Sequence, residues 1–381
     1  MNDNEGEEWW MEEETSLLRG IRDNDPNTTS LYCDRNWIQN MTDEDWEQLG
    51  RDIASNTHLT KVDLFDAALN DRTASFLFRG LTRSSSITNV NLSDNELSAA
   101  GIRGMVPFLQ NANNLTYLGL SNNNIQSEGF NLLIRALRDS PIETLSCQSC
   151  GIESVEIDSE HMPRHLKMLL LFDNSINSDG CRGLARLLRG RDAELEFLSL
   201  PDNNIDDEGV EVLVDALQSN TSLRELYLQE NGDISKEGKI MLLKLVNDVS
   251  SIEATLQSNH TLRKIHFFGD KQRSLQHINM ATAINRLQEE AGRKKVIETQ
   301  LNSVKRAEVA ELQGVSQSLY SEINPLHLPE VLALVARHHG QGELYVALRS
   351  SIAGVISTVS RKEWPLWDTV SESRSNKRRR F

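Results

Sequence analysis

One hydrophobic pattern recurs along the middle of the chain and limits the folds that the chain can adopt. Each copy reads Leu-x-x-Leu-x-Leu-x-x-Asn-x-Ile or a close variant, and most copies begin about 28 residues after the preceding one. The copies begin at Leu59, Ile87, Leu115, Ile142, Leu166, Leu195, Leu223 and Leu262. A period of this length predicts a solenoid, in which each unit buries its apolar face against its neighbours.

Each repeat has a strand half and a helix half. In the repeat that begins at Leu195, Leu198 and Leu200 are two residues apart, which places both on one face of a short strand. Leu213 and Leu217 follow at helical spacing. Ser98, Asn177, Asp206 and Ser235 are predicted N-caps, with Gln126 as a weaker cap in the same place. Two repeats depart from this plan, since Glu153 to His165 lacks a helical pattern and Ser251 to Ser258 adds a helical segment.

An asparagine follows most of the strands at a fixed place, where its side chain can satisfy the backbone of the turn. These residues are Asn95, Asn123, Asn174, Asn203 and Asn231, while Cys150 and Ala67 occupy the place in two other repeats. With its period and its helical half, the repeat resembles the ribonuclease-inhibitor-like (RNI-like) class of leucine-rich repeats over roughly residues 31 to 290. The resemblance implies an α/β horseshoe with an inner parallel sheet and outer helices.

The solenoid accounts for only part of the 381 residues. We expect residues 1–30 to be an acidic, disordered segment, and residues 31–292 to be the solenoid with an atypical N-terminal capping repeat. Residues 293–361 are predicted to form a small helical C-terminal unit that caps the solenoid, and residues 362–381 a flexible basic tail.

Composition excludes several classes of function. The net charge of −16 argues against nonspecific nucleic-acid binding. The sequence contains neither a long apolar run nor a secretory signal, so we expect an intracellular, cytoplasmic protein with no membrane contact. No motif for a cofactor, a metal or catalysis is present. Cys147 and Cys150 have the spacing of a redox or zinc motif, but the repeat register predicts that both belong to the core.

Four consecutive cations lie near the end of the acidic chain: Lys377, Arg378, Arg379 and Arg380. Such a cluster resembles a nuclear localisation signal, which a nuclear import receptor binds through an acidic groove. The alternative interpretation is a solvated charged tail.

Strand residues between the buried leucines face the concave side, where they are predicted to be mostly polar in the first three repeats, although Phe65 is among them, and to form an apolar, aromatic stripe from the fifth repeat onward. The candidate protein-binding residues are Tyr117, Met168, Leu170, Phe172, Phe197, Tyr227 and Phe268. Exposed aromatic residues often anchor protein partners. The alternative is that the C-terminal segment of the chain covers this stripe.

The pattern therefore predicts a non-enzymatic scaffold or adaptor that binds a protein partner on the concave face. The alternative is a regulator of a small GTPase, because the Ran GTPase-activating family has repeats of this class. That family usually carries an acidic C-terminal segment, whereas this chain ends in cations, so no residue here is assigned to that activity.

Overall fold

The structure is a computed structural model that describes residues 16–33, 35, 41–157, 163–190, 194–267, 273–286, 291–296 and 303–314. The chain divides into two compact units. The first comprises Met1–Asn247 and Ser258–Gln288, and the second comprises Asp248–Gln257 and Glu289–Phe381. The described strands all belong to the first unit.

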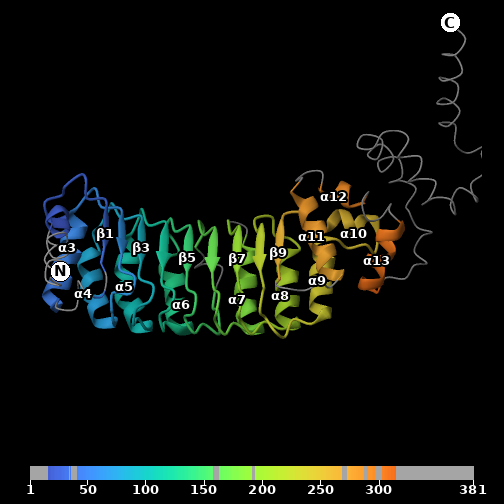
Figure 1. The fold of residues 1–381 in the computed structure, drawn as a ribbon, viewed down its shortest axis with the longest axis horizontal. Coiled ribbons are helices and arrows are strands. Elements are labelled where there is room, and N and C mark those ends of the chain that lie inside the picture. The colour runs from blue at the N-terminus through green and yellow to red at the C-terminus, as the bar shows by residue number, and fades with distance from the viewer. Residues whose placement is uncertain are drawn as a thin grey trace, which may run out of the picture. The chain divides into compact units, whose positions relative to one another are not determined.

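Nine short parallel strands form one open sheet in which each strand pairs with the next strand along the chain (Figure 1). They are β1 (Ser30–Tyr32), β2 (Lys61–Asp63), β3 (Asn89–Asn91), β4 (Tyr117–Gly119), β5 (Thr144–Ser146), β6 (Met168–Leu170), β7 (Phe197–Ser199), β8 (Glu225–Tyr227) and β9 (Lys264–His266). This arrangement confirms the predicted parallel-stranded α/β solenoid.

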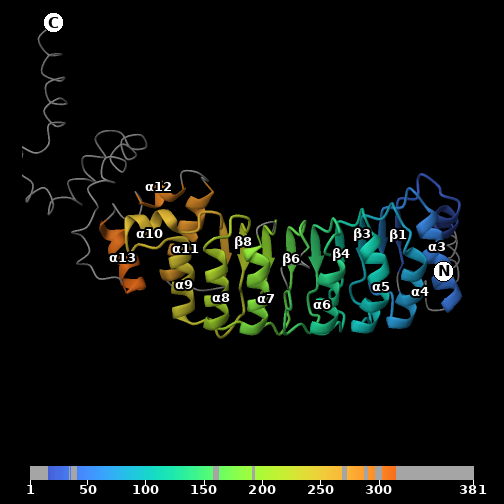
Figure 2. The same cartoon turned by 180° about the vertical axis from the view of Figure 1, so that it is seen from behind.

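Helices form a second row beside the sheet, and the view from behind shows the same order (Figure 2). The helices of the first unit are α3 (Asp43–Ser55), α4 (Asp71–Leu81), α5 (Ala99–Asn111), α6 (Gln126–Ala136), α7 (Ser178–Arg189), α8 (Asp207–Leu217), α9 (Lys236–Val246) and α11 (Arg273–Asn285). The core lies between the two rows. Leu198 on β7 pairs with Leu169 on β6 and with Leu226 on β8, and all three side chains are buried.

Helix starts follow the predicted caps with one exception. The side chains of Ser98, Asn177, Asp206 and Ser235 each accept a hydrogen bond from the first turn of a helix. Gln126 was predicted to be a weak cap, but it is the first residue of α6, and the capping residue Ile125 makes no side-chain bond. Gln126 has a positive φ of 55°. The turn before α6 therefore has a different backbone path from the turns that carry a polar cap.

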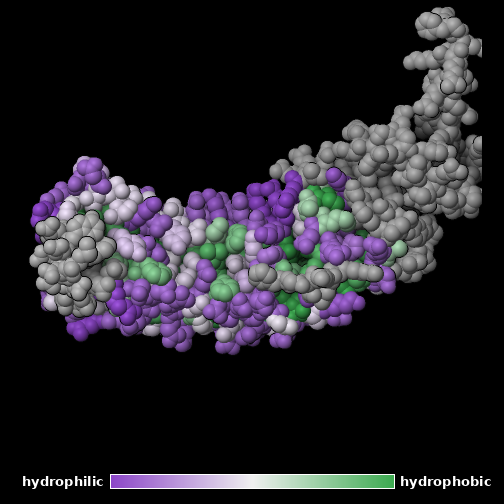
Figure 3. Space-filling view, in the orientation of Figure 1, coloured by the Kyte–Doolittle hydropathy of each residue, from purple (hydrophilic) through white to green (hydrophobic). Residues whose placement is uncertain are grey.

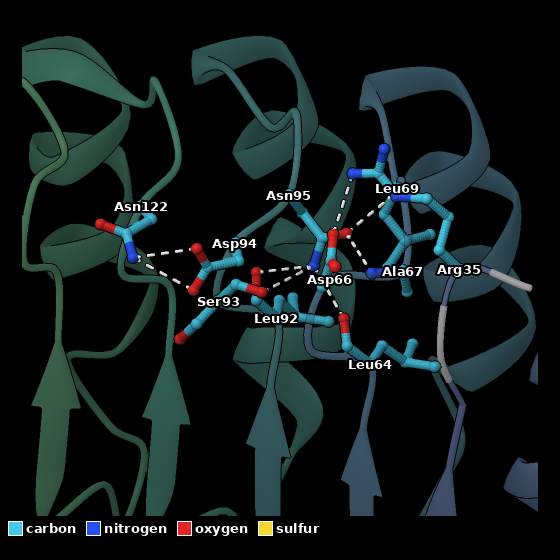
Figure 4. Close-up of polar contacts among 10 residues, drawn as sticks. All are labelled: Arg35, Leu64, Asp66, Ala67, Leu69, Leu92, Ser93, Asp94, Asn95 and Asn122. Carbon is cyan, nitrogen blue, oxygen red and sulfur yellow. Dashed lines mark hydrogen bonds and ion pairs between the residues drawn. The ribbon is translucent and has the colours of Figure 1, made fainter.

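The asparagine ladder joins successive turns as predicted (Figure 4). Asn95 is buried, and its Oδ1 accepts hydrogen bonds from the backbone of Ala67 at 3.1 Å and of Leu69 at 2.8 Å. Its Nδ2 donates to the carbonyl oxygens of Leu64 and Leu92. The first turn, which has Ala67 in place of an asparagine, is thus satisfied by the asparagine of the next repeat.

In the described part of the fourth repeat, residues 151–157 have no regular secondary structure, where other repeats have a helix. This outcome agrees with the missing helical pattern in that part of the sequence. Ser127 Oγ accepts the backbone N–H groups of Glu153 and Ser154, and Asn131 Oδ1 accepts that of Glu156. Side chains of α6 therefore replace the hydrogen bonds that a helix would make internally.

The second unit contains α10 (Ile252–Gln257), α12 (Ala291–Lys295) and α13 (Ser303–Gln313). Helix α10 is the additional segment that the sequence predicts in the long repeat. The backbone N–H of Val249 donates to Oε1 of Gln313 at 3.1 Å, which links the start of this unit to α13. Residues 315–381, which include most of the predicted C-terminal cap and the whole basic tail, lie outside the described residues.

Candidate functional site

The candidate residues lie on the strand face, which we define as the face of the sheet that points away from the helices. In a parallel sheet in register, residues at the same place in successive repeats lie side by side. Met168 on β6 pairs with Thr144 on β5 and with Phe197 on β7. Leu170 pairs with Ser199, which in turn pairs with Tyr227 on β8. The register thus brings the candidates on β6, β7 and β8 together.

Large exposed apolar side chains concentrate on this face. In the described part of the chain, five large hydrophobic residues are exposed: Tyr32, Phe65, Met168, Phe172 and Leu256. All except Leu256 belong to the strand face or to the turn that directly follows its strands. Met168 is 36% exposed and Phe172 is 37% exposed, whereas Leu170, Phe197 and Tyr227 are half-buried. In the orientation of Figure 1, separate apolar patches lie among polar side chains (Figure 3).

Two candidates do not join this group. Tyr117 lies on β4 and is separated from β6 by β5, whose side chains on this face are Thr144 and Ser146. Burial, and then the charge of Asp63, raises the pKa of Tyr117. Phe268 lies outside the described residues, as does the basic segment 377–380, so both stay predictions.

An aromatic cluster spans β7 to β9. The ring of Phe197 stacks in a tilted arrangement on Tyr227 with a centroid separation of 4.8 Å, and Tyr227 meets His266 edge to face at 5.2 Å. Lys264 Nζ lies 4.6 Å from the centroid of the Tyr227 ring. Aromatic and cation–π contacts of this kind hold side chains in one orientation. The cluster is therefore a preformed feature of the strand face.

Hydrogen bonds fix the polar edges of this cluster. Lys264 Nζ donates to the hydroxyl of Tyr227 at 2.6 Å, and that hydroxyl donates to Glu225 Oε2 at 2.9 Å. Gln229 Nε2 donates to Nδ1 of His266 at 2.6 Å. Burial, followed by the charge of Lys264, lowers the pKa of His266, so its neutral form predominates at neutral pH. A neutral imidazole can accept the Gln229 bond at Nδ1.

The sequence interpretation missed the apolar residues at the first end of the sheet. It treated the early repeats as mostly polar on this face, yet Tyr32 is 62% exposed and Phe65 is 42% exposed. Leu31 pairs with Val62, which places Tyr32 beside Asp63 in the same row as the later face residues. A period of about 28 residues would place Leu31 beside Leu59, whereas Leu31 pairs with Val62, so extending the repeat register does not locate Tyr32.

The cysteine pair behaves as the register predicts. Cys147 and Cys150 are buried, like Cys33 and Cys181, and none of the four is part of a disulfide. Burial, together with the neighbouring Cys150, raises the pKa of the Cys147 thiol well above its ordinary value. Cys150 Sγ donates to the carbonyl oxygens of Leu120 and Gln148, where an asparagine of the ladder would use its amide. Among the described residues, no group of three or more His, Cys, Asp or Glu side chains is arranged to hold a metal ion.

Comparisons with known proteins agree with this architecture. A family profile described as "Leucine Rich repeat" matches residues 111–130, 195–214 and 219–243. No curated protein sequence matches the chain. Among the helices of the described ranges, none is both long enough and apolar enough to cross a membrane.

Two solved structures illustrate the structural similarity. Actin-binding site 2 of leiomodin-1 is 19% identical over 41% of this chain and 77% of that chain, with a TM-score of 0.31. The tropomodulin C-terminal domain of Caenorhabditis elegans is 9% identical over 72% of this chain and 93% of that chain, with a TM-score of 0.22. These similarities are too low to bear on function. The repeat profile and the parallel sheet together establish that the chain carries leucine-rich repeats folded as a solenoid.

Proposed function

We propose that this chain is a non-enzymatic interaction scaffold that binds a protein partner on the strand face between β6 and β8. The observation that carries the proposal is the exposure of Met168 and Phe172 beside the stacked rings of Phe197 and Tyr227. Apolar side chains on a paired sheet lose little conformational entropy when a partner covers them. Aromatic residues in such a setting dominate the energy of many protein interfaces.

We also assign the repeats to the RNI-like class. Successive repeats consist of one strand and one α-helix, as in β7 with α8 and in β8 with α9. A full helix in a repeat of about 28 residues supports this subclass over the shorter leucine-rich repeats. In a solenoid of this kind, the sheet provides a continuous binding surface. The regulator of a small GTPase stays the alternative function, and an assay of GTP hydrolysis with purified small GTPases tests it.

Paired alanine substitutions test the proposed face. The full-length protein and its Phe172→Ala/Tyr227→Ala variant are used as baits, and retained proteins are quantified by mass spectrometry. The matched control is Tyr32→Ala/Phe65→Ala, which removes two aromatic rings from the same face at its other end. We expect the first variant to lose at least one partner by about tenfold or more, and the control to retain it.

Thermal unfolding of each variant separates loss of binding from loss of folding. The proposal expects Phe172→Ala/Tyr227→Ala to stay folded, with a melting temperature lowered by only a few degrees, because Phe172 is exposed and Tyr227 loses its contacts with Phe197 and Lys264. A lower melting temperature with no lost partner would mean that these side chains support the fold, and the proposed face would be wrong.

A further inference from the structure

We infer that the segment of the partner that contacts β6 to β8 carries lysine or arginine side chains. These cations would lie along one edge of the apolar stripe of this chain, which consists of Met168, Leu170, Phe172, Phe197 and Tyr227. This inference rests on the proposed function and adds the chemistry of the partner. Three observations support it: a row of carboxylates along the turn edge of the strand face, the different charge pattern at the opposite edge, and a buried acceptor in the aromatic cluster.

The carboxylates follow β6, β7 and β8 at the same place in each repeat: Asp173, Asp202 and Glu230. The backbone pairing continues into these turns, since Asp173 N donates to Pro201 O at 3.0 Å and Asp202 N donates to Gln229 O at 2.9 Å. Neighbouring strands lie about 4.8 Å apart, so three like charges stand side by side. Asp suits the positive φ of Asp173 and Asp202, but this backbone conformation does not require a charge, because Asn122 and Ser149 occupy the same place in other repeats. Like charges in adjacent strands are unfavourable for stability.

The acidic turns of the earlier repeats include one carboxylate with a cationic partner, Asp66, and one with a neutral partner, Asp94 (Figure 4). Arg35 donates to Asp66 at 2.8 Å, and the amide of Asn122 donates to both oxygens of Asp94 at 3.1 Å. In the later turns, Asp173 accepts a hydrogen bond from the hydroxyl of Ser149. No Lys, Arg or His in the described ranges forms an ion pair with Asp202 or Glu230. Among the described residues, Asp202 and Glu230 thus lack an ion pair near the exposed Met168 and Phe172, whereas Asp66, near the exposed Tyr32 and Phe65, has one.

The opposite edge of the same strands has a balanced charge pattern. Lys167, just before β6, pairs with Glu143 at 2.8 Å, and Arg224, just before β8, pairs with Glu196 at 3.3 Å. The apolar side chains of the strand face lie between this edge and the carboxylate row. A partner that covers the apolar stripe must therefore place its cations over the turn edge, where the local potential is negative.

The aromatic cluster supplies the third observation. Gln229 is only 7% exposed, and its Oε1 accepts no hydrogen bond from any residue that the structure describes. Because this oxygen has almost no exposed surface, an ammonium or guanidinium group of a partner can donate to it only after the Gln229 side chain turns outward. The nearby Tyr227 ring already contacts the ammonium group of Lys264. The cluster thus combines an unused acceptor with an aromatic surface that accommodates cations.

A nucleic acid fits this surface poorly. Its phosphates would face Asp173, Asp202 and Glu230, and the resulting repulsion would add to that of a chain with a net charge of −16. A cationic protein segment gains from the same charges and also covers the apolar side chains. We therefore use single-stranded RNA and duplex DNA as expected negative probes in the test.

Peptide selection on the full-length chain tests the inference without a known partner. The probe is a display library of random peptides, selected on the parent protein and counter-selected on Phe172→Ala/Tyr227→Ala. Affinities of the enriched peptides are then compared for the parent and for Asp173→Asn/Asp202→Asn/Glu230→Gln. Each of these three residues has a positive φ, and amide side chains keep the size of the acids, with Asn well tolerated there.

The matched control is Glu44→Gln/Asp139→Asn/Glu211→Gln, which removes the same charge from exposed positions outside the strand face. We expect the enriched peptides to combine aromatic or aliphatic residues with lysine or arginine. We expect their affinity to fall about tenfold in the carboxylate variant, to stay unchanged in the control, and to weaken as salt is added.

Neutral or acidic peptides that need Phe172 and Tyr227 would overturn this inference and leave the proposed function intact. A selection that yields no peptide dependent on these two rings would count against both. Binding of RNA or DNA that the carboxylate variant strengthens, in the absence of cationic peptides, would also overturn it.

Discussion

Buried polar side chains carry much of the specificity of this fold at the scale of single residues. Asn203 is 5% exposed, accepts the backbone N–H of Ile176 at 2.9 Å, and donates to the carbonyl oxygens of Leu171, Leu200 and Pro201. One side chain therefore satisfies backbone groups of two repeats. Because no water can replace these bonds in a packed core, the asparagine is a structural requirement of the turn.

We predict that Asn203→Ala lowers the free energy of unfolding by about 1–3 kcal/mol, because it leaves buried backbone groups unpaired. Denaturant titration of the full-length protein measures this change. The neighbouring Asn204 is exposed, so Asn204→Ala is the control and should stay within about 0.5 kcal/mol of the parent. Equal changes in the free energy of unfolding for the two substitutions would show that the asparagine ladder does not stabilise the fold more than an exposed asparagine does.

Lys295 on α12 is a second residue with a testable energetic role. Burial lowers the pKa of Lys295 from 10.5 to about 7. The unfolded chain therefore binds more protons than the folded chain between these values, so stability rises with pH from about 7 to 10.5. Below pH 7 the penalty is complete.

Replacing Lys295 by Met removes this penalty and keeps the length of the side chain. We predict that Lys295→Met raises the stability of the second unit at neutral pH by up to a few kcal/mol and flattens its dependence on alkaline pH. Lys294 is exposed, which makes Lys294→Met the matched control. An unchanged pH profile of unfolding in Lys295→Met would contradict the assignment.

At the scale of elements, residues 151–157 of the fourth repeat pack on the neighbouring helix α7. The contact is closest at Gly183 on α7, where a Cβ atom would overlap the carbonyl oxygen of Val155. The side chains of Val155 and Ile157 are buried, so this segment supplies apolar contacts that a helix provides elsewhere. Close backbone approach here depends on a residue without a side chain.

A glycine-to-alanine substitution usually stabilises the interior of a helix by about 1 kcal/mol. We predict the opposite sign for Gly183→Ala, a loss of about 1–3 kcal/mol, because the added methyl group overpacks the contact with Val155. Gly232 has no atom within 4 Å of an added Cβ, so Gly232→Ala is the control. If unfolding curves show that Gly183→Ala has a higher free energy of unfolding than the parent, the packing argument is wrong.

The sequence predicts strands, turns and helix caps only where the spacing of residues within one repeat determines them. Leu198 and Leu200 establish β7, and Asn203 establishes the turn that follows, because each role repeats at a fixed place. The cap at Gln126 was predicted wrongly, since the turn before α6 follows another backbone path. The spacing within one repeat does not tell which side chains of two neighbouring repeats are in contact where the interval between those repeats differs from about 28 residues.

The candidate site illustrates the same limit. Its apolar members were predictable from the strand register, but the contacts of Tyr227 with Lys264 and of Gln229 with His266 cross the longest interval between repeats. The insertion that contains α10 lies between β8 and β9 in the sequence and leaves their pairing in register. Such pairs require the sheet itself, because nothing in the local sequence joins them.

At the scale of the whole molecule, the chain is a repeat array in which function is expected to follow position along the sheet. Each repeat contacts its neighbours, so the strand face is built cumulatively and differs from one end to the other. Polar side chains occupy this face on β3, while β6 to β8 carry the apolar stripe. The central claim is that partners bind at that later part of the sheet.

Site-specific photo-crosslinking tests this claim most directly. A photoreactive phenylalanine replaces Ser199, which lies on the strand face between Leu170 and Tyr227, and in a second protein it replaces Glu211, which is exposed on α8. Both full-length proteins are irradiated with the same cell extract, and crosslinked products are identified by mass spectrometry. The account predicts specific partners captured from position 199 and absent at position 211. Partners captured only from position 211 would contradict it.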